Sequence, residues 1–182
     1  YDPFRRKGYS GSTEFHFMAQ RGDLDLFFVS GVQIDRQGNF NLHVIGEHDA
    51  PELRLPGAYG TGMLYYMAKR VVLFRTEHTR RTFVHRVDFV TAAGSSPESV
   101  HRPGGPSALV TTKAVFDWRP STELGAGGEW VLRSVHPGSS VEEVLSEMGF
   151  RPRVPEEVSV TEEPAAEQLR LLRTVVRAKL MG

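Results

Sequence analysis

Apolar positions recur along this chain at two spacings, which together predict a fold that mixes helices with strands. Helical spacing is found over residues 13–20, 62–70 and 162–179. Short apolar or alternating runs predict strands over residues 24–30, 41–45, 71–75, 83–90, 109–118 and 130–135. A helix followed directly by a strand, as at residues 62–75, indicates a crossover connection. The pattern therefore favours an α/β protein.

The first strand leads into a turn that carries polar side chains. Residues 26–29 (LFFV) form an apolar run that stops at Ser30 and Gly31, which predicts a buried strand ending at the edge of a sheet. The segment QIDRQGNFN follows at residues 33–41, and its Gly38-Asn39 pair permits positive φ and side-chain bonds back to the chain. Because α/β proteins place ligands outside strand ends, we expect this turn to lie near a ligand.

Glycine, serine and proline mark the ends of several further predicted elements. Residues 109–118 and 130–135 flank the glycine-rich STELGAGG, so we expect an antiparallel pair at a sheet edge. A helix over residues 140–148 begins with Ser140 and Glu143, a capping box, and is ended by Gly149. The last helix, residues 162–179, places Pro164 in its first turn, where proline is tolerated.

The amino-acid composition excludes several classes of protein. The 182 residues carry 22 basic and 22 acidic side chains, a balance that argues against nucleic-acid binding, and the length suits one domain. No apolar run reaches the roughly 18 residues of a membrane span. The absence of cysteine excludes a disulfide framework, a thiolate nucleophile and Cys-ligated zinc. With no signal peptide visible, we expect a cytoplasmic protein that contacts neither membrane nor nucleic acid.

The glycine-rich segment GAYGTG at residues 57–62 is the first candidate for chemistry. It precedes a helix, so its backbone N–H groups and the helix dipole are suited to an anion or a developing oxyanion. The carboxamides of Gln33 and Asn39 either orient a bound thioester or carboxylate, or they simply close the turn. Asp35 is expected to be a turn-capping carboxylate.

The remaining candidates are weaker. Arg80 and Arg81 belong to a basic run that either meets phosphates or forms a solvated strand edge, and the second interpretation is favoured. The seven histidines show no HExxH or comparable spacing, so we expect no metal site. The lack of a G-x-S-x-G elbow argues against a serine hydrolase.

Four ordered blocks carry a family resemblance. The chain resembles the β (B-type) subunits of family I coenzyme A transferases, especially the glutaconate and 3-oxoacid types, which have Q-V-D-x-x-G-N-x-N followed by K/R-L-P-G-x-G-G. The likeness continues at residues 81–94, 111–118 and 134–150. The matching positions are Gln33, Asp35, Gly38, Asn39, Asn41, Arg54, Leu55, Pro56, Gly57 and Gly60.

This resemblance implies a mixed, mostly parallel sheet flanked by helices, the coenzyme A transferase (NagB/RpiA-like) fold, over residues 1–182 as a single domain. It also implies an N-terminally incomplete chain, because the family's catalytic glutamate lies in an S-E-N-G setting before the block that begins at Gln33. Glu123 and Glu147 stand in E-x-G triplets, but in the wrong context. The nucleophile is therefore expected outside this chain.

The implied activity is transfer of coenzyme A between an acyl-CoA and a carboxylate through a glutamyl thioester. Coenzyme A would be a substrate, with no permanently bound cofactor, and an α-type subunit would complete a heterodimer or heterotetramer. In this scheme Gly57, Gly60, Gln33 and Asn39 form the oxyanion and acyl-CoA site, and Arg80 and Arg81 are possible contacts of the CoA phosphates. Tyr59 replaces a family glycine, so it either narrows the acyl site or defines a different acyl group.

Two alternatives stay open. Relatives of this fold hydrolyse or cleave cyclic acyl-CoA compounds instead of transferring CoA, and product analysis separates the two because transfer requires a carboxylate acceptor. A non-catalytic structural subunit is the other alternative, suggested by the missing glutamate and by Tyr59.

Overall fold

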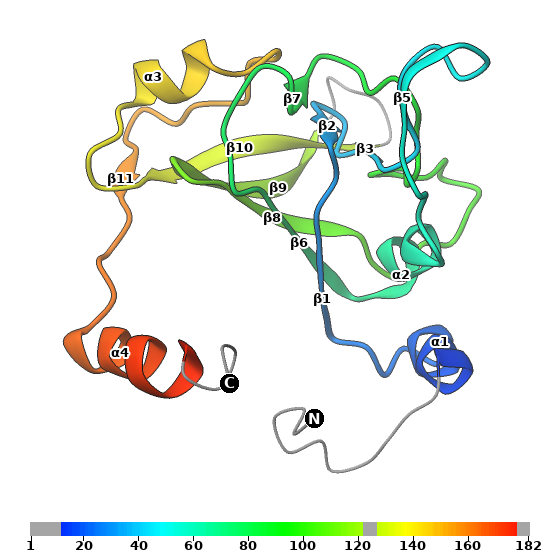
Figure 1. The fold of residues 1–182 in the computed structure, drawn as a ribbon, viewed down its shortest axis with the longest axis horizontal. Helices are drawn as coiled ribbons and strands as arrows, with labels where there is room; N and C mark the ends of the chain where they lie inside the picture. The colour runs from blue at the N-terminus through cyan, green and yellow to red at the C-terminus, as the bar shows by residue number, and fades with distance from the viewer. Residues whose placement is uncertain (1–11, 122–126, 178–182) are drawn as a thin grey trace.

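A six-stranded mixed sheet forms the centre of the computed structural model, which describes residues 12–121 and 127–177 (Figure 1). Its strand order is β1-β6-β8-β9-β10-β11. The strands are β1 (Leu26–Val29), β6 (Arg70–Phe74), β8 (Pro106–Val110), β9 (Ala114–Ser121), β10 (Gly127–Val135) and β11 (Ser159–Val160). β1, β6 and β8 are parallel, β9 is antiparallel to both β8 and β10, and β11 is parallel to β10. The predicted mixed, mostly parallel sheet is confirmed.

Smaller elements surround this sheet. A three-stranded sheet has the order β3-β2-β7 and a hairpin joins β4 to β5. The helix α2 lies in the crossover between the parallel strands β1 and β6, as the sequence predicted. The bounds are β2 (Gln33–Asp35), β3 (Phe40–Asn41), β4 (Val44–Gly46), β5 (Pro51–Arg54), β7 (Phe83–Val84), α1 (Ser12–Gln20), α2 (Thr61–Met67), α3 (Val141–Ser146), α4 (Ala166–Leu171) and the π-helix η1 (Leu172–Val176).

The core lies on one face of the large sheet. Strand register aligns Leu73, Leu109, Phe116 and Leu132 across four neighbouring strands, and all four side chains are fully buried. They belong to one apolar cluster with Phe40 and Phe83 of the small sheet and Tyr65 of α2. The core therefore fixes the small sheet and α2 against the large one.

Residues 26–29 form a strand as predicted, but the prediction that this strand is buried is wrong for one of its two faces. β1 is an edge strand, and its register places Val29 toward the core but Leu26 and Phe28 on the opposite side. Leu26 is 40% exposed and Phe28 is 60% exposed. Phe74 of the adjacent β6 is 42% exposed. An apolar run predicts the strand, but it does not reveal which face other elements cover.

Several predicted boundaries also differ from the structure. The expected strand over 83–90 pairs only at Phe83–Val84, because the chain then bends. The expected strand over 109–118 is two strands, since the backbone turns between β8 and β9. β9 and β10 are antiparallel as predicted, yet they lie inside the sheet rather than at its edge, because β8 and β11 flank them.

The helix ends are partly as predicted. The Ser140 side chain caps α3 by accepting the Glu143 N–H at 3.1 Å, but the Glu143 carboxylate bonds Lys113 instead of completing the box. α4 begins at Ala166, so Pro164 precedes it rather than lying in its first turn. Part of the expected last helix, residues 178–179, lies outside the described residues.

Two features are absent from the described part of the chain. Within it no helix combines the length and the apolar composition needed to cross a bilayer. Over the same residues no group of three or more His, Asp or Glu side chains is gathered as metal ligands would be.

A buried histidine anchors α3. His78 is 3% exposed, and its Nε2 donates to the Val144 carbonyl at 3.0 Å while Nδ1 lies 2.9 Å from the Thr111 hydroxyl. Burial lowers the pKa of His78 below its ordinary value.

We expect the free energy of unfolding to fall as the pH drops below about 6.5, because the unfolded chain then takes up a proton that buried His78 resists. Each pKa unit of depression corresponds to about 1.4 kcal/mol. Urea unfolding between pH 8 and pH 5 measures the effect. The His78→Gln variant should show a flatter pH dependence, whereas the exposed His48→Gln should match the parent. Equal slopes for His78→Gln and the parent would contradict this account.

Candidate functional site

The turn between β2 and β3 is organised by a buried carboxylate. Asp35 is fully buried, and its Oδ1 accepts the backbone N–H groups of Gln37 at 2.9 Å and Asn39 at 3.0 Å. Its Oδ2 accepts the Asn39 side-chain amide at 3.0 Å. Burial raises the pKa of Asp35, and the donated hydrogen bonds oppose that rise. Asp35 is thus a turn-capping carboxylate, as the sequence predicted.

The same turn is held from two distant elements. Trp130 of β10 donates its indole N–H to the Asp35 carbonyl at 3.0 Å, and Tyr65 of α2 donates its hydroxyl to the Gly38 carbonyl at 2.6 Å. Burial raises the pKa of Tyr65, so the phenol stays protonated as a donor. Gly38 has φ 73°, and a Cβ there would lie 2.8 Å from the ring of Trp118. Only glycine suits this position.

Gln33 is the centre of a second cluster of hydrogen bonds. Its amide nitrogen donates to Asp88 at 2.9 Å, and its oxygen accepts the Asn41 side chain at 2.8 Å and the Asp88 backbone N–H at 2.9 Å. Asn41 also caps the following residues, because its oxygen accepts the His43 backbone N–H at 2.9 Å. Gln33 is 5% exposed.

The two carboxamides predicted for the acyl site are therefore fully engaged within the chain. Asn39 donates to Asp35 and accepts the Gly94 backbone N–H at 3.0 Å, so both ends of its amide are bonded. The same holds for Gln33. These contacts favour the interpretation that both side chains close the turn, and direct contact with an acyl group stays a prediction.

The glycine-rich loop lies beside this turn. The Gly57 N–H donates to the Leu42 carbonyl at 3.2 Å, and the Leu55 N–H donates to the His43 carbonyl at 2.8 Å. Gly57 and Gly60 adopt φ 88° and 73°, which an L side chain disfavours. α2 begins after Gly60 but has only seven residues, so its dipole adds little. The loop's own backbone is what can approach a ligand closely.

Tyr59 is a backbone outlier in this loop. Its φ of 36° makes it the one described non-glycine residue with positive φ, a conformation that costs roughly 1–3 kcal/mol. Its side chain is 84% exposed and meets His16 of α1 edge to face at 6.3 Å between ring centroids. Because the ring projects outward, it does not fill space inside this chain.

Sequence reasoning missed the histidines that flank the loop. The Nε2 atom of His43 lies 3.6 Å from where a Gly57 Cβ would stand, and that of His16 lies 2.5 Å from the equivalent point at Gly60. Neither belongs to a recognisable spacing. Their relation to the loop depends on contacts between segments distant in sequence, which periodicity does not report.

The arginines predicted as phosphate contacts lie elsewhere. Arg80 donates its Nε to the Ser146 carbonyl of α3 at 2.7 Å, and Arg81 is exposed beside it in the chain. None of the contacts found for Arg80 joins it to the glycine loop. Their role toward CoA phosphates stays a prediction. Of the two E-x-G glutamates, Glu147 pairs with Lys113 at 2.8 Å and Glu123 lies outside the described residues.

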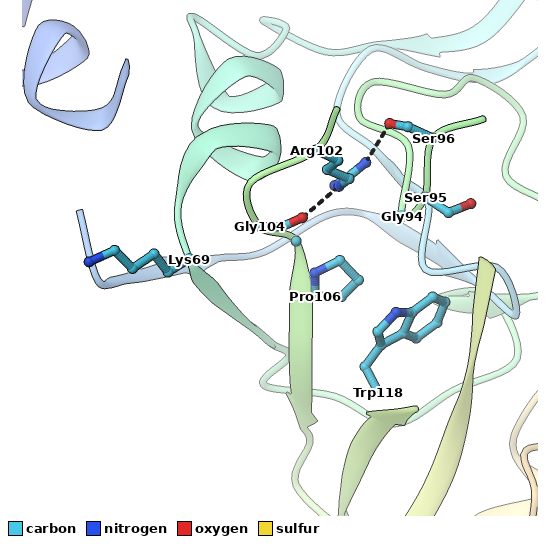
Figure 2. A pocket seen from close by; sticks show the side chains of 9 residues that line it. Lys69, Gly94, Ser95, Ser96, Arg102, Gly104, Pro106 and Trp118 are labelled. Carbon is cyan, nitrogen blue, oxygen red and sulfur yellow. Dashed lines mark hydrogen bonds between the residues drawn. The ribbon is translucent and has the colours of Figure 1, made fainter. Parts of the chain in front are cut away.

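A separate cleft of about 310 Å³ opens at the other end of α2 (Figure 2). Arg102 lies over the rings of Tyr65 and Tyr66 and donates to the carbonyls of Gly104 and Ala93. At the rim, Lys69 pairs with Asp25 at 2.7 Å. Because both cations already have partners, we interpret Arg102 as a clamp between α2 and the segment that leads into β8. The cleft residues are Lys69, Gly94, Ser95, Ser96, Arg102, Gly104, Gly105, Pro106 and Trp118.

Comparisons with known proteins agree with the fold. A family model described as "Coenzyme A transferase" matches residues 2–147. The B-type subunit of the 3-oxoadipate CoA-transferase of Pseudomonas knackmussii is 34% identical over 167 residues, which cover 88% of this chain and 62% of that protein. The B-type subunit of the glutaconate CoA-transferase of Acidaminococcus fermentans is 29% identical over 153 residues, covering 80% of this chain and 54% of that protein. This chain belongs to the coenzyme A transferase family.

Solved structures of related proteins have the same fold. The decarboxylase AibA/AibB matches with a TM-score of 0.78 at 28% identity, over 93% of this chain and 64% of the matched chain. IpdAB of Rhodococcus jostii RHA1 matches with a TM-score of 0.81 at 24% identity, over 92% of this chain and 66% of its own, which supports the fold. The chain spans 54% to 62% of the length of the two CoA-transferase subunits.

We expect Asp35→Asn to destabilise the fold by about 1–3 kcal/mol, because an amide at this place turns an acceptor into a donor. Rotation of Asn39 would not repair the contact, since its amide nitrogen would then face the Gly94 N–H. Chemical unfolding measures the loss. Asp49→Asn, at a fully exposed carboxylate, is the matched control and should leave stability unchanged. Equal stability of the two variants would show that Asp35 does not organise the turn.

Proposed function

We propose that this chain is part of the β (B-type) subunit of a heteromeric coenzyme A transferase, which moves coenzyme A from an acyl-CoA to a carboxylate through a glutamyl thioester. An α-type subunit is the proposed partner, coenzyme A is a substrate, and the cytoplasm is the proposed location. The observation that carries the proposal is the family match, together with the glycine loop, which is bonded to Leu42 and His43 just after β3.

In the proposed cycle a glutamate carboxylate attacks the thioester carbonyl and expels the CoA thiolate, giving an acyl-glutamyl anhydride. The thiolate then attacks the glutamyl carbonyl, releases the donor carboxylate and leaves a glutamyl thioester. An acceptor carboxylate runs the same two steps in reverse. Covalent catalysis divides a difficult transfer into easier steps. The proposed source of this glutamate is a segment or partner subunit outside these 182 residues.

The contribution proposed for this chain is the oxyanion side of the site. The backbone from Gly57 to Gly60 has left-handed turns, and among the described residues only the His43 side chain lies within 4 Å of the Cβ position of Gly57, which suits close approach to a thioester carbonyl. Gln33 and Asn39 hold the turn between β2 and β3, and β3 leads to Leu42 and His43, whose carbonyls accept the N–H groups of Gly57 and Leu55. Tyr59, exposed and strained, is proposed to face the acyl group or the partner subunit.

A second candidate is hydrolysis or cleavage of a cyclic acyl-CoA. It is favoured by 30% identity over 157 residues to the cholesterol ring-cleaving hydrolase IpdB subunit of Rhodococcus jostii, covering 79% of this chain and 56% of that protein. Decarboxylation is a further candidate of this kind, because the decarboxylase AibA/AibB is a structural match to this chain. The two reactions differ from transfer in needing no carboxylate acceptor.

The test of the main proposal is an acceptor series with the complex of this protein and its co-purified partner. Incubated with acetyl-CoA or glutaryl-CoA and a panel of carboxylates, the complex should form a new acyl-CoA only when an acceptor is present. Mass spectrometry of peptides from the same reaction should find CoA on a glutamate. Free CoA released without acceptor would support the hydrolase instead, and no turnover at all would support a structural subunit.

We expect Gly57→Val to reduce CoA transfer by about 100-fold or more while the complex stays folded, because a side chain there obstructs the approach of the thioester. Gly138→Val is the matched control. Gly138 has almost the same φ, 87° against 88°, and open space around its Cβ position, so it carries the same backbone strain away from the site. Steady-state rates and thermal unfolding should be compared for both. Equal rates would remove the loop from the mechanism.

A further inference from the structure

We propose that His43 donates a hydrogen bond from Nε2 to the thioester oxygen of the acyl-CoA, together with the backbone of the Gly57 loop. This inference rests on the proposed function, because it assigns a residue to that acyl site. His43 lies two residues after Asn41, the last residue of β3, and none of the sequence patterns singled it out.

The orientation of the ring is fixed on one side by Thr91. The Nδ1 atom of His43 lies 2.6 Å from the Thr91 hydroxyl oxygen. That oxygen already accepts the Leu42 backbone N–H at 2.8 Å. Thr91 has one hydroxyl hydrogen, and among the contacts found for it only the imidazole nitrogen can accept that hydrogen. We assign Nδ1 as the acceptor of that hydrogen, so that the ring hydrogen lies on Nε2.

Ring stacking and backbone hydrogen bonds further restrict the position of the His43 side chain. The ring of Phe89 lies 4.5 Å from that of His43 between centroids, tilted by 36°. The His43 backbone is bonded at both ends, since its N–H donates to Asn41 and its carbonyl accepts the Leu55 N–H. A donor held in this way needs little reorganisation when negative charge develops on a bound oxygen.

The Nε2 atom faces the glycine loop and has no hydrogen-bond partner in the part of the chain that the structure describes. It lies 3.6 Å from the Cβ position of Gly57, and His43 is half-buried. Nε2 is not among the buried polar atoms that lack a partner, so solvent reaches it and the oxygen of a bound ligand can replace that solvent. The absence of a side chain on Gly57 keeps this N–H accessible from the loop.

His43→Leu and His43→Gln test the proposal in the complex. Leucine keeps apolar bulk but has no donor, whereas the glutamine amide carries an N–H at about the place of Nε2. We expect kcat for CoA transfer to fall about 100- to 1,000-fold in His43→Leu, with KM for acyl-CoA changed only a few-fold, and to recover at least tenfold in His43→Gln. His48→Leu is the matched control, because His48 stacks on the same Phe89 at 5.4 Å but is exposed, and it should leave kcat unchanged.

Unchanged kcat in His43→Leu, a loss confined to KM, or a glutamine variant as poor as leucine would each overturn the proposal while leaving the transferase assignment intact. Nitrogen NMR of the wild-type complex, with ¹⁵N-histidine in this chain, gives a readout independent of turnover and of variant folding. Nε2 of His43 should be protonated, and its resonance should shift when acetyl-CoA or glutaryl-CoA is added. A complex that transfers no CoA would refute the proposed function. In that case the NMR measurement decides the His43 proposal separately: if neither acyl-CoA shifts the Nε2 resonance, the proposal is refuted as well.

Discussion

The carboxylate of Asp35 is the constraint on which the candidate site depends. It gathers the N–H groups of a tight turn in a fully buried place, and that turn is also bonded to β10 through Trp130 and to α2 through Tyr65. The glycine loop immediately precedes α2, and it is bonded to the residues just after the turn. Fixing Asp35 therefore fixes both flanks of the loop. Buried polar networks of this kind are stabilising only when every member is satisfied, as here.

Side chains and backbone have different roles in this arrangement. The polar side chains of the turn form hydrogen bonds within the chain, so the groups that remain for a ligand are the backbone of the loop and the imidazole of His43. A site made in this way is rigid, since its supports lie in the core. Tyr59 and Gly60 of the loop are exposed, which suits a site that a second subunit completes. Tyr59 is the exposed aromatic side chain of this loop.

The sequence predicted the parts of this picture that depend on neighbouring residues. The turn at Gly38, the role of Asp35, the crossover through α2 and the cap at Ser140 all follow from local spacing and turn chemistry. What it could not predict depends on distant contacts. His43 gains its orientation from Thr91, 48 residues away, and Gln33 meets Asp88, 55 residues away. The strand expected over 83–90 has the right alternation, yet pairing stops at Val84 because the chain bends after it. The exposed face of β1 was missed since apolarity does not say what covers a strand.

The most direct test of the central claim is an experimental structure of the complete complex with an acyl-CoA bound. If the turn organised by Asp35 positions an acyl site, the thioester oxygen should lie about 3 Å from a backbone N–H of the Gly57–Gly60 loop and from Nε2 of His43. An acyl group bound away from this loop, with the Gly57 turn packed against protein instead of ligand, would contradict the account.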